Sequence, residues 1–297
     1  MHQSVLLNEV LHYMEPQKGA FIVDGTANGG GHAMAISELL GPKGKLLALD
    51  WDCELLKKFE SRINNKELRI VARCANYAEL PEILREEKLG KADGLLLDLG
   101  FSSEQIEGAQ RGFSFQKDEP LDMRYNLHQP ISAYEAVNTL PEKELTDMFW
   151  KFGEERFAGR VARAIVEARR QKPIRTTAHL AEVIAEAMPP SYRRHKIHPA
   201  TKVFQALRIY VNNELGNLER ALESLSLVLK RDGRVVVISF HSLEDRMVKN
   251  YFRDMKKSGT AELLTKKPVT ATEEEIARNP RARSAKLRAI RMCSLVN

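Results

Sequence analysis

Short apolar runs that end in an acidic residue alternate with amphipathic stretches over the first hundred residues. Between the runs, residues 32–40 and 52–64 carry apolar side chains at three- and four-residue spacing, which predicts helices. Near-continuous apolar strands that alternate with helices are typical of a parallel sheet buried on both faces. The pattern therefore predicts an α/β fold, with strands at residues 21–24 (FIVD), 45–50 (KLLALD), 68–73 (LRIVAR) and 94–98 (GLLLD).

The strand pattern then stops, and from about residue 106 to 210 we find only helical periodicity. It predicts a helix over residues 154–171, a second one capped by Thr176 or Thr177, and a long amphipathic stretch over 201–230. Strands return at 234–240 (RVVVISF) and, after an exposed charged excursion over 254–283, near 285–292. This order predicts a helical insertion in an α/β domain, with boundaries at 1–108, 109–211 and 212–297.

The composition is that of a globular protein, and its charge is unevenly distributed. Hydrophobic residues make up 43% and charged residues 29%, which disfavours disordered, collagen-like and coiled-coil structures. Residues 1–105 carry 12 basic and 16 acidic side chains, residues 106–211 carry 17 and 13, and residues 212–297 carry 17 and 11. The basic later segments indicate a polyanionic partner, and a solvated basic surface is the alternative. Candidate phosphate contacts are Arg193, Arg194, His195 and Lys196, and Arg281, Arg283, Lys286 and Arg288.

Cysteine and apolar content exclude several other classes. Cys53, Cys74 and Cys293 form no C-x-x-C pair and are odd in number, so we expect neither a disulfide framework nor a zinc site. No basic-then-apolar signal segment opens the chain, and runs such as 235–238 are too short to span a bilayer. A cytoplasmic protein with no membrane partner and no metal is expected.

A glycine-rich loop, DGTANGGGH at residues 24–32, follows the first predicted strand and opens the first helix. Glycine lets a backbone approach a ligand closely, and a helix N-terminus offers N–H groups to a carboxylate or phosphate. The loop has neither G-x-G-x-x-G spacing nor a Gly-Lys-Ser/Thr ending, so it matches neither a dinucleotide site nor a P-loop. A tight turn without a ligand is the alternative.

Asp50 ends the second predicted strand about twenty residues after the loop, where an acid can accept hydrogen bonds from ribose hydroxyls. Loop and acid together predict a nucleoside-containing cofactor. S-adenosylmethionine has a carboxylate, a ribose and a cationic sulfonium but no phosphate, so it fits better than a dinucleotide. A solvated acid at a strand end is the alternative.

Two more polar segments follow predicted strands. In DLGFSS (98–103), Phe101 could stack on a base, while Asp98, Ser102 or Ser103 could accept its exocyclic N–H; an ordinary turn is the alternative. In SFHSLEDR (239–246), Ser242 and Asp245 predict a helix capping box. His241 is either a hydrogen-bonded structural histidine or a proton shuttle.

Together these segments resemble the MraW/RsmH family, methyltransferases that modify the N4 amine of a cytidine in small-subunit ribosomal RNA. The resemblance covers nearly the whole chain and implies a Rossmann-like class I methyltransferase fold with an inserted all-helical domain. It rests on many motifs in one order: HQSVLLNEV (2–10), DGTANGGGH (24–32), LLLDLGFSS (95–103), RGFSF (111–115), PLDMR (120–124), GEERFA (153–158), HPATKVFQALRIYVNNEL (198–215), SFHSLEDR (239–246) and NPRARSAKLR (279–288).

The resemblance also implies roles for individual residues around the cofactor. It places the methionine end of the donor against Gly30, Gly31 and His32, and the adenosine ribose against Asp50. An aromatic residue beside the adenine matches Tyr77, where many relatives carry phenylalanine. Asp98 and Gln105 complete the donor pocket, and no motif identifies a catalytic base.

The sequence therefore predicts methyl transfer from S-adenosylmethionine to the N4 amine of a cytidine in 16S ribosomal RNA. The RNA is expected to be bound within the small ribosomal subunit, and a homodimer is left open. A non-catalytic RNA-binding module that keeps the pocket is one alternative, and the intact loop and acid disfavour it. An NAD-type oxidoreductase is the other, and the missing pyrophosphate glycine spacing disfavours that.

Overall fold

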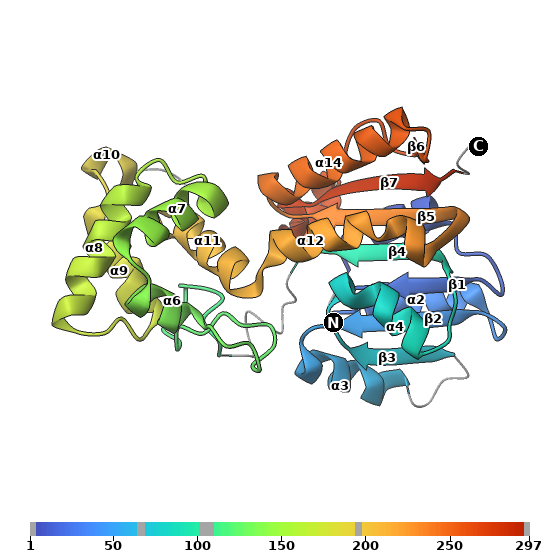
Figure 1. Ribbon diagram of the computed structural model, residues 1–297, viewed down its shortest axis with the longest axis horizontal. Helices are drawn as coiled ribbons and strands as arrows, with labels where there is room; N and C mark the ends of the chain where they lie inside the picture. The colour runs from blue at the N-terminus through green and yellow to red at the C-terminus, as the bar shows by residue number, and fades with distance from the viewer. Residues whose placement is uncertain (1–3, 64–68, 101–109, 194–197, 294–297) are drawn as a thin grey trace. The chain divides into compact units, whose positions relative to one another are not determined.

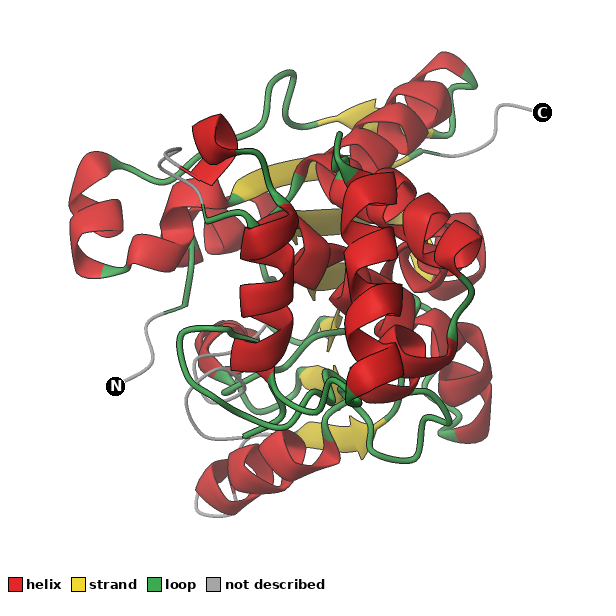
Figure 2. Ribbon diagram, turned by 90° about the vertical axis from the view of Figure 1, so that its left-hand side faces the viewer, coloured by secondary structure: helices red, strands yellow, loops and turns green. Residues whose placement is uncertain are grey.

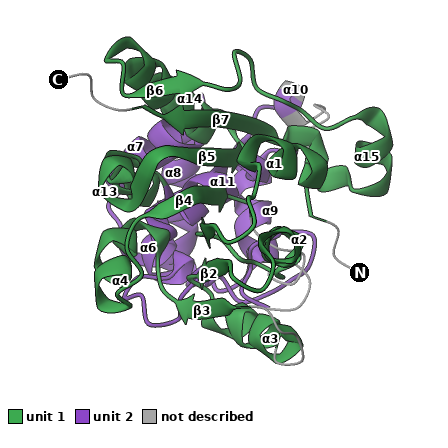
Figure 3. Ribbon diagram, turned by 90° about the vertical axis from the view of Figure 1, so that its right-hand side faces the viewer, with its two compact units in different colours: residues 1–102, 215–297 green, residues 103–214 purple. Residues whose placement is uncertain are grey.

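The computed structural model describes residues 4–63, 69–100, 110–193 and 198–293. The chain divides into two compact units, shown in different colours in Figure 3. Unit 1 comprises Met1–Ser102 and Leu215–Asn297, and unit 2 comprises Ser103–Glu214. Each unit has a hydrophobic core of its own.

Unit 1 is built on a seven-stranded sheet in the order β3-β2-β1-β4-β5-β7-β6 among the described residues (Figure 1). The first five strands in that order are parallel, and β7 is antiparallel to both of its neighbours. The expected Rossmann-like α/β fold is therefore confirmed. The strands are β1 (Phe21–Asp24), β2 (Lys45–Asp50), β3 (Ile70–Cys74), β4 (Ala92–Asp98), β5 (Leu229–Ser239), β6 (Ala261–Leu263) and β7 (Lys286–Met292).

Helices cover both faces of this sheet, which explains why its strands are apolar almost throughout. Val23 and Leu95 point to one face and Ile22 and Leu96 to the other, and all four are buried. The first face packs on α4 (Leu80–Glu86), α12 (Glu214–Glu223), α13 (Leu225–Val228) and α14 (Ser242–Lys257). The second face packs on α1 (Leu7–Met14), α2 (Gly31–Leu40) and α3 (Cys53–Ile63); in Figure 3, α4 and α13 lie on the left of the sheet and α1 and α2 on the right.

The register of the sheet gathers the predicted polar residues at one edge. Asp24 at the end of β1 is paired with Leu96 on β4, and Asp98 at the end of β4 is paired with Ile238 on β5. Asp50 at the end of β2 is paired with Cys74, the last residue of β3. Parallel strands thus bring their carboxyl ends together, which is where open α/β sheets bind ligands.

Unit 2 contains helices and no strand among its described residues, although one isolated bridge joins Pro120 and Thr176. Figure 2 separates helices, in red, from strands, in yellow. The core of unit 2 includes the fully buried Phe149 and Leu207. Its helices are α6 (Ala133–Thr139), α7 (Glu142–Gly153), α8 (Ala158–Gln171), α9 (Thr177–Ala187), α10 (Pro190–Arg193) and α11 (Ala200–Asn212).

Caps and left-handed residues explain where the helices differ from the expected ones. Thr176 caps α9 by accepting the N–H of His179, as one of the two expected alternatives. The helix expected over 154–171 begins only at Ala158, because Glu154 at φ 48° ends α7. The stretch expected over 201–230 is divided after Asn213, at φ 46°, which ends α11. Within the four described ranges, no helix combines the length and the apolar character needed to cross a bilayer.

The segment expected to be an exposed excursion contains regular structure. Beyond α14, the chain forms β6, then α15 (Glu273–Arg278) and a 3₁₀ turn, η2 (Pro280–Ser284). The strand β6 has three residues, which is too short to show an alternating pattern in the sequence. It is a strand because it pairs with β7. Ile276 of α15 packs on the core of unit 1.

The expectation that no disulfide forms is wrong. Cys53 at the start of α3 and Cys74 at the end of β3 are joined by a disulfide, with Cα atoms 5.1 Å apart. They are 21 residues apart in sequence, and only the pairing of β2 with β3 brings them together. Both cysteines lie near Asp50, because Asp50 is paired with Cys74 and Cys53 follows Asp50 three residues later.

We expect the disulfide to protect two of the three thiols. Without reductant, iodoacetamide should add one group to the unfolded chain, at Cys293, and after reduction it should add three. Because a cross-link restricts the unfolded chain, reduction should lower the free energy of unfolding by about 3 kcal/mol. Intact mass spectrometry and urea titration measure the two effects. Three groups added before reduction would contradict the assignment, and Cys53→Ser/Cys74→Ser is the control that reductant should not affect.

Candidate active site at the carboxyl edge of the sheet

The glycine-rich loop between β1 and α2 crosses the carboxyl ends of the two neighbouring strands. The N–H of Gly25 donates to the carbonyl of Leu96 on β4 (2.9 Å), and the N–H of Ala27 donates to that of Leu49 on β2 (2.7 Å). Gly30 has φ 82°, a conformation that glycine adopts without strain, and it leads directly into α2. The loop therefore lies where the sequence predicts a ligand site.

The glycines that open α2 are required by the protein's own packing. A Cβ at Gly30 would overlap the ring of Phe59 on α3, and a Cβ at Gly31 would overlap the hydroxyl group of Ser4. The absence of a side chain at these glycines thus lets Phe59 of α3 and Ser4 of the N-terminal segment pack closely against the loop. The loop is held in shape before any ligand binds.

Asp50 holds the same loop from β2. Its Oδ2 accepts the N–H of Asn28 (2.7 Å) and its Oδ1 accepts the N–H of Asp52 (2.8 Å). Burial raises the pKa of Asp50 to about 7, against the lowering effect of those two N–H groups. Each carboxylate oxygen can accept a second hydrogen bond, so Asp50 can hold the loop and still bind a hydroxyl group.

Asp24, the last residue of β1, is an acidic group that the predicted site residues did not include. It is fully buried, its Oδ1 accepts the N–H of Thr26 (3.1 Å), and its Oδ2 has no partner among the described residues. Burial raises its pKa to about 7. The signal was present in the sequence, as an acid that closes a buried strand directly before a glycine-rich loop.

Asp98, at the end of β4, lies close to both the loop and His32. Its backbone N–H donates to the hydroxyl oxygen of Thr26 (2.6 Å), and its Oδ2 lies 3.6 Å from Nδ1 of His32. Its Oδ1 is buried and has no partner among the described residues. Burial, together with the charges of Asp24 and Glu244, raises the pKa of Asp98 to about 8.

His32 connects Asp98 to the N-terminal segment. Its Nε2 lies 3.0 Å from the carbonyl oxygen of Val5, and because a carbonyl can only accept, Nε2 carries a proton. Nδ1 is the ring atom that faces Asp98. The N–H of the next residue, Leu6, donates to Oε1 of Glu275 on α15 (2.7 Å). The segment that orients His32 is thus fixed by a residue near the other end of the chain.

Tyr77 lies beside the loop in the 3₁₀ turn η1 (Tyr77–Glu79) that follows β3. The side chain of Asn76 accepts the N–H of Ala78 (2.9 Å) and so shapes this turn. A Cβ at Gly25 would lie 3.1 Å from the Cβ of Tyr77, which makes the two residues direct neighbours. The aromatic residue is therefore at the same sheet edge as the loop and Asp50.

The structure brings most of the predicted donor-site residues to one edge of the sheet: Gly30, Gly31, His32, Asp50, Tyr77 and Asp98. Four further predicted residues lie outside the described residues: Phe101, Ser102, Ser103 and Gln105.

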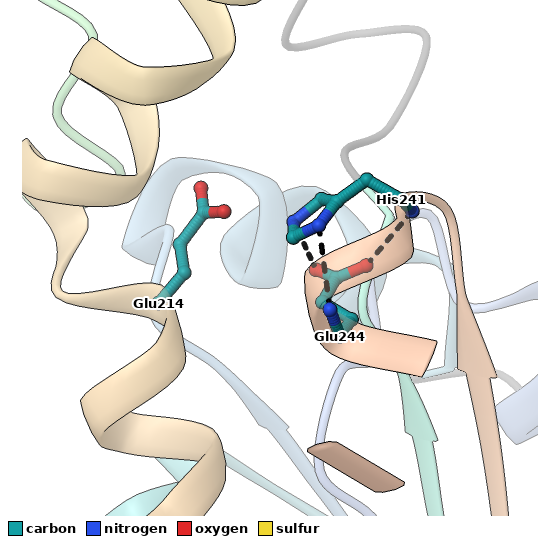
Figure 4. Close-up of side chains that lie close together, drawn as sticks. All are labelled: Glu214, His241 and Glu244. Atoms are coloured by element: carbon teal, nitrogen blue, oxygen red, sulfur yellow. Dashed lines mark hydrogen bonds and ion pairs between the residues drawn. The ribbon is translucent and has the colours of Figure 1, made fainter. Parts of the chain in front are cut away.

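His241 is the N-cap of α14, which corrects the capping box expected at Ser242 and Asp245. Its Nδ1 accepts the N–H of Glu244 (3.4 Å), and its Nε2 lies 3.1 Å from Oε1 of Glu244 (Figure 4). Oε2 of Glu244 accepts the N–H groups of Phe240 (2.9 Å) and His241 (3.3 Å). A histidine can replace serine as the cap here because its unprotonated ring nitrogen accepts the same N–H.

Two further acids have partners within their own units. Asp245 binds Arg288 (2.7 Å). Burial raises the pKa of Asp245, but the hydrogen bonds and charges of Arg288 and Lys286 together outweigh burial, so the pKa is lowered. Glu214, also drawn in Figure 4, belongs to unit 2, where Arg208 (2.8 Å) and the hydroxyl of Tyr125 (3.0 Å) donate to its carboxylate.

Buried carboxyl oxygens without partners among the described residues, one each on Asp24 and Asp98, suit a ligand that carries positive charge. Together with a glycine-rich loop on a sheet of this order, they fit a Rossmann-like class I methyltransferase. Residues 1–293 match the sequence model of the MraW methylase family, and the chain belongs to that family. It is therefore an S-adenosylmethionine-dependent methyltransferase.

Several relatives are similar over almost their full length, and each is named ribosomal RNA small subunit methyltransferase H. That of Koribacter versatilis is 50% identical, over 97% of this chain and 93% of its own. That of Syntrophotalea carbinolica is 47% identical, over 98% and 97%. That of Syntrophus aciditrophicus is 46% identical, over 97% and 96%.

Solved structures resemble the chain much more distantly. NSun6 from Pyrococcus horikoshii is 15% identical with a TM-score of 0.47, over 98% of this chain and 53% of its own. Fibrillarin from Aeropyrum pernix, solved with S-adenosyl-L-methionine, is 11% identical with a TM-score of 0.43, over 96% and 71%. The assignment to the family rests on the sequence relatives.

We expect donor affinity to rise with pH between about 6 and 8. In the free protein the raised pKa values, about 7 for Asp24 and Asp50 and about 8 for Asp98, leave the first two groups about half protonated and Asp98 largely protonated at neutral pH. A sulfonium cation favours the ionised forms, so binding releases protons, and affinity should be about tenfold higher at pH 8 than at pH 6 for one proton released.

Isothermal titration in two buffers of different ionisation enthalpy measures the proton release. S-adenosylhomocysteine has the same amino acid end without the sulfonium charge, so its affinity should change less with pH. An equal pH dependence for the two ligands would contradict the role of the carboxyl groups.

Proposed function

We propose that the chain transfers a methyl group from S-adenosylmethionine to the exocyclic N4 amine of a cytidine in 16S ribosomal RNA. The names of its relatives support the RNA substrate. The observation that carries the choice of an amine is Asp98, a carboxyl group at the end of β4 with a buried oxygen that lacks a partner among the described residues. An exocyclic amine carries N–H groups, which such an oxygen can accept.

We assign the donor to the loop side of the edge. Gly30, Gly31 and His32 would hold its methionine end, since they form the N-terminus of α2. Asp50 would accept the ribose hydroxyls, and Tyr77 would lie along the adenine. Asp98 and Gln105 complete the donor pocket in this proposal.

We assign the cytidine to the segments after β4 and β5, where Phe101, Ser102, Ser103 and His241 are the candidates. His241 acts through structure in this proposal, because its ring nitrogens are occupied by Glu244 and the helix cap. It would hold the turn after β5 against the end of β4 and so shape the place for the base.

When bound, S-adenosylmethionine supplies an electrophilic methyl group on a sulfonium. Asp98 would accept a hydrogen bond from the cytidine amine, which keeps the nitrogen lone pair out of the ring and aims it at the methyl carbon. As the N–C bond forms and the S–C bond breaks, the nitrogen becomes acidic and the sulfonium charge that kept Asp98 ionised is lost. Asp98 can then take the proton, because its pKa in the absence of the sulfonium is raised to about 8.

A covalent enzyme intermediate is not needed in this mechanism, and the cysteines do not suit one. Cys53 and Cys74 lie near Asp50 but are bonded to each other. Cys293 has a free thiol and directly follows the last residue of β7. Positioning and charge would therefore supply most of the acceleration.

We further infer that the enzyme works in the cytoplasm on RNA within the small ribosomal subunit. The homodimer that the sequence leaves open stays a prediction.

We expect cells that lack this protein to lose one N4-methylated cytidine from 16S ribosomal RNA. Purified protein with S-adenosylmethionine should restore it on subunits from those cells. Nucleoside mass spectrometry after nuclease digestion measures both. Binding of the subunits without any gain of methyl groups would support the non-catalytic module instead, and methylation of a different atom would overturn the proposed amine.

We expect Asp50→Asn to weaken donor binding at least tenfold, because the amide lacks one acceptor and its NH₂ group would face the N–H of Asn28 or Asp52. Asp52→Asn is the matched control. Asp52 is equally buried and two residues away, but its Oδ1 accepts the N–H of Glu54 (3.2 Å) at the start of α3, a cap that asparagine can replace. Isothermal titration measures both affinities, and equal losses would remove Asp50 from the donor site.

A further inference from the structure

A cleft of about 160 Å³ lies in unit 1 beside the outer edge of the sheet, away from the glycine loop. Phe252 of α14 and Leu263 of β6 form its apolar lining. Four basic side chains also line it, those of Lys249, Arg253, Lys266 and Arg288. β6 is the last strand of the sheet, so nothing in the described part of unit 1 pairs with its free side.

Two of the four basic groups of this cleft have no acidic partner among the described residues. Lys249 and Lys266 are exposed and have no hydrogen bond or ion pair with any described residue. Arg253 shares the exposed Asp254 with Lys257. Glu262, the acid on β6, is taken by Arg291.

Arg288 differs from the other three because it is buried. Its exposed fraction is 8%, and Asp245 on the first turn of α14 accepts its Nε–H (2.7 Å). This ion pair neutralises Arg288 and joins β7 to α14. The cleft therefore has a fixed, neutral inner end and two free ammonium groups on Lys249 and Lys266.

The position of the cleft relates it to the candidate active site. Arg288 is paired with Val237, two residues before the end of β5. Asp98 is paired with Ile238, the next residue along the same strand. The inner end of the cleft thus lies at the carboxyl edge of the sheet, within unit 1, on the side beyond β5.

We propose that this cleft binds phosphate groups of the RNA strand on one side of the target nucleotide, with Lys249 and Lys266 as the contacts. Two free ammonium groups in a concave site repel each other and are stabilised by an anion. A repeated anion that reaches the same edge as Asp98 is the backbone of the nucleic acid. The inference rests on the proposed function, because it takes RNA as the substrate.

The test compares Lys249→Gln/Lys266→Gln with Lys18→Gln/Lys43→Gln. Lys18 and Lys43 are also exposed and without partners among the described residues, and they lie before β1 and β2, at the amino ends of the strands. Both double variants lose two positive charges. Filter binding to 16S ribosomal RNA transcribed in vitro, and to single-stranded polyuridylate, over a series of KCl concentrations measures the affinity.

We expect the cleft variant to bind both RNAs about tenfold more weakly at 0.1 M KCl, and the slope of log affinity against log salt to fall by about 1.5. The single variants Lys249→Gln and Lys266→Gln should each lose about threefold. The control should change less than twofold. Affinity for S-adenosylmethionine without RNA should stay the same in all variants, which shows that they are folded.

Equal losses in the cleft variant and the control would overturn the proposal, since total charge alone would then explain them. Unchanged RNA binding together with lost binding to phosphatidylglycerol vesicles would also overturn it, in favour of a membrane surface. Polyuridylate contains no cytidine, so its binding tests the cleft even if the chain methylates another base. Conversely, if the cleft variant binds RNA as tightly as the wild type and methylates cytidine normally, the proposed phosphate-binding cleft is overturned while the proposed function stands.

Discussion

The burial of three carboxyl groups at the ends of neighbouring strands is the constraint around which the edge of the sheet is organised. Asp24, Asp50 and Asp98 each end a parallel strand, and the register brings these ends together. Burial disfavours the charge on each, and the charge of Asp24 further disfavours the charges of Asp50 and Asp98. A fold selected for stability alone would place apolar or amide groups here. Conflict of this kind is typical of binding sites, where the free protein keeps unfavourable groups that a ligand of opposite charge then satisfies.

The surrounding structure limits this conflict without removing it. Thr26 accepts the N–H of Asp98 while its own N–H binds Asp24, and the N–H of Asn28 binds Asp50. The loop is therefore ordered by the same acids that it would present to the donor. Packing adds to this, because Phe59 and Ser4 occupy the space that side chains at Gly30 and Gly31 would need. A preformed loop of this kind spends little of the binding free energy on ordering itself.

The repeating parts of the fold were predictable from the sequence, and contacts between distant residues were not. Apolar strands such as 45–50 and 94–98 identified the parallel sheet because burial on both faces leaves a local pattern, and the acids that end them, Asp50 and Asp98, could be located from it. The strand β6 was missed because three residues carry no periodicity. The bond between Cys53 and Cys74 was missed because it depends on strand pairing, and the capping box was placed one residue too late because histidine is an uncommon cap. The approach of Val5 to His32 leaves no local signal at all.

The hydrogen bond between Leu6 and Glu275 has a consequence for the order in which the protein can mature on the ribosome. The N-terminal segment leaves the exit tunnel first, yet the residue that secures it is made only after more than nine-tenths of the chain. β4 likewise waits for β5, whose residues follow the whole helical unit. During translation the first four strands can associate, but His32 is not yet held by an anchored segment. A nascent chain or a fragment ending before α15 would therefore present an unfinished donor pocket, and methyl transfer becomes available only to a chain whose synthesis is almost complete.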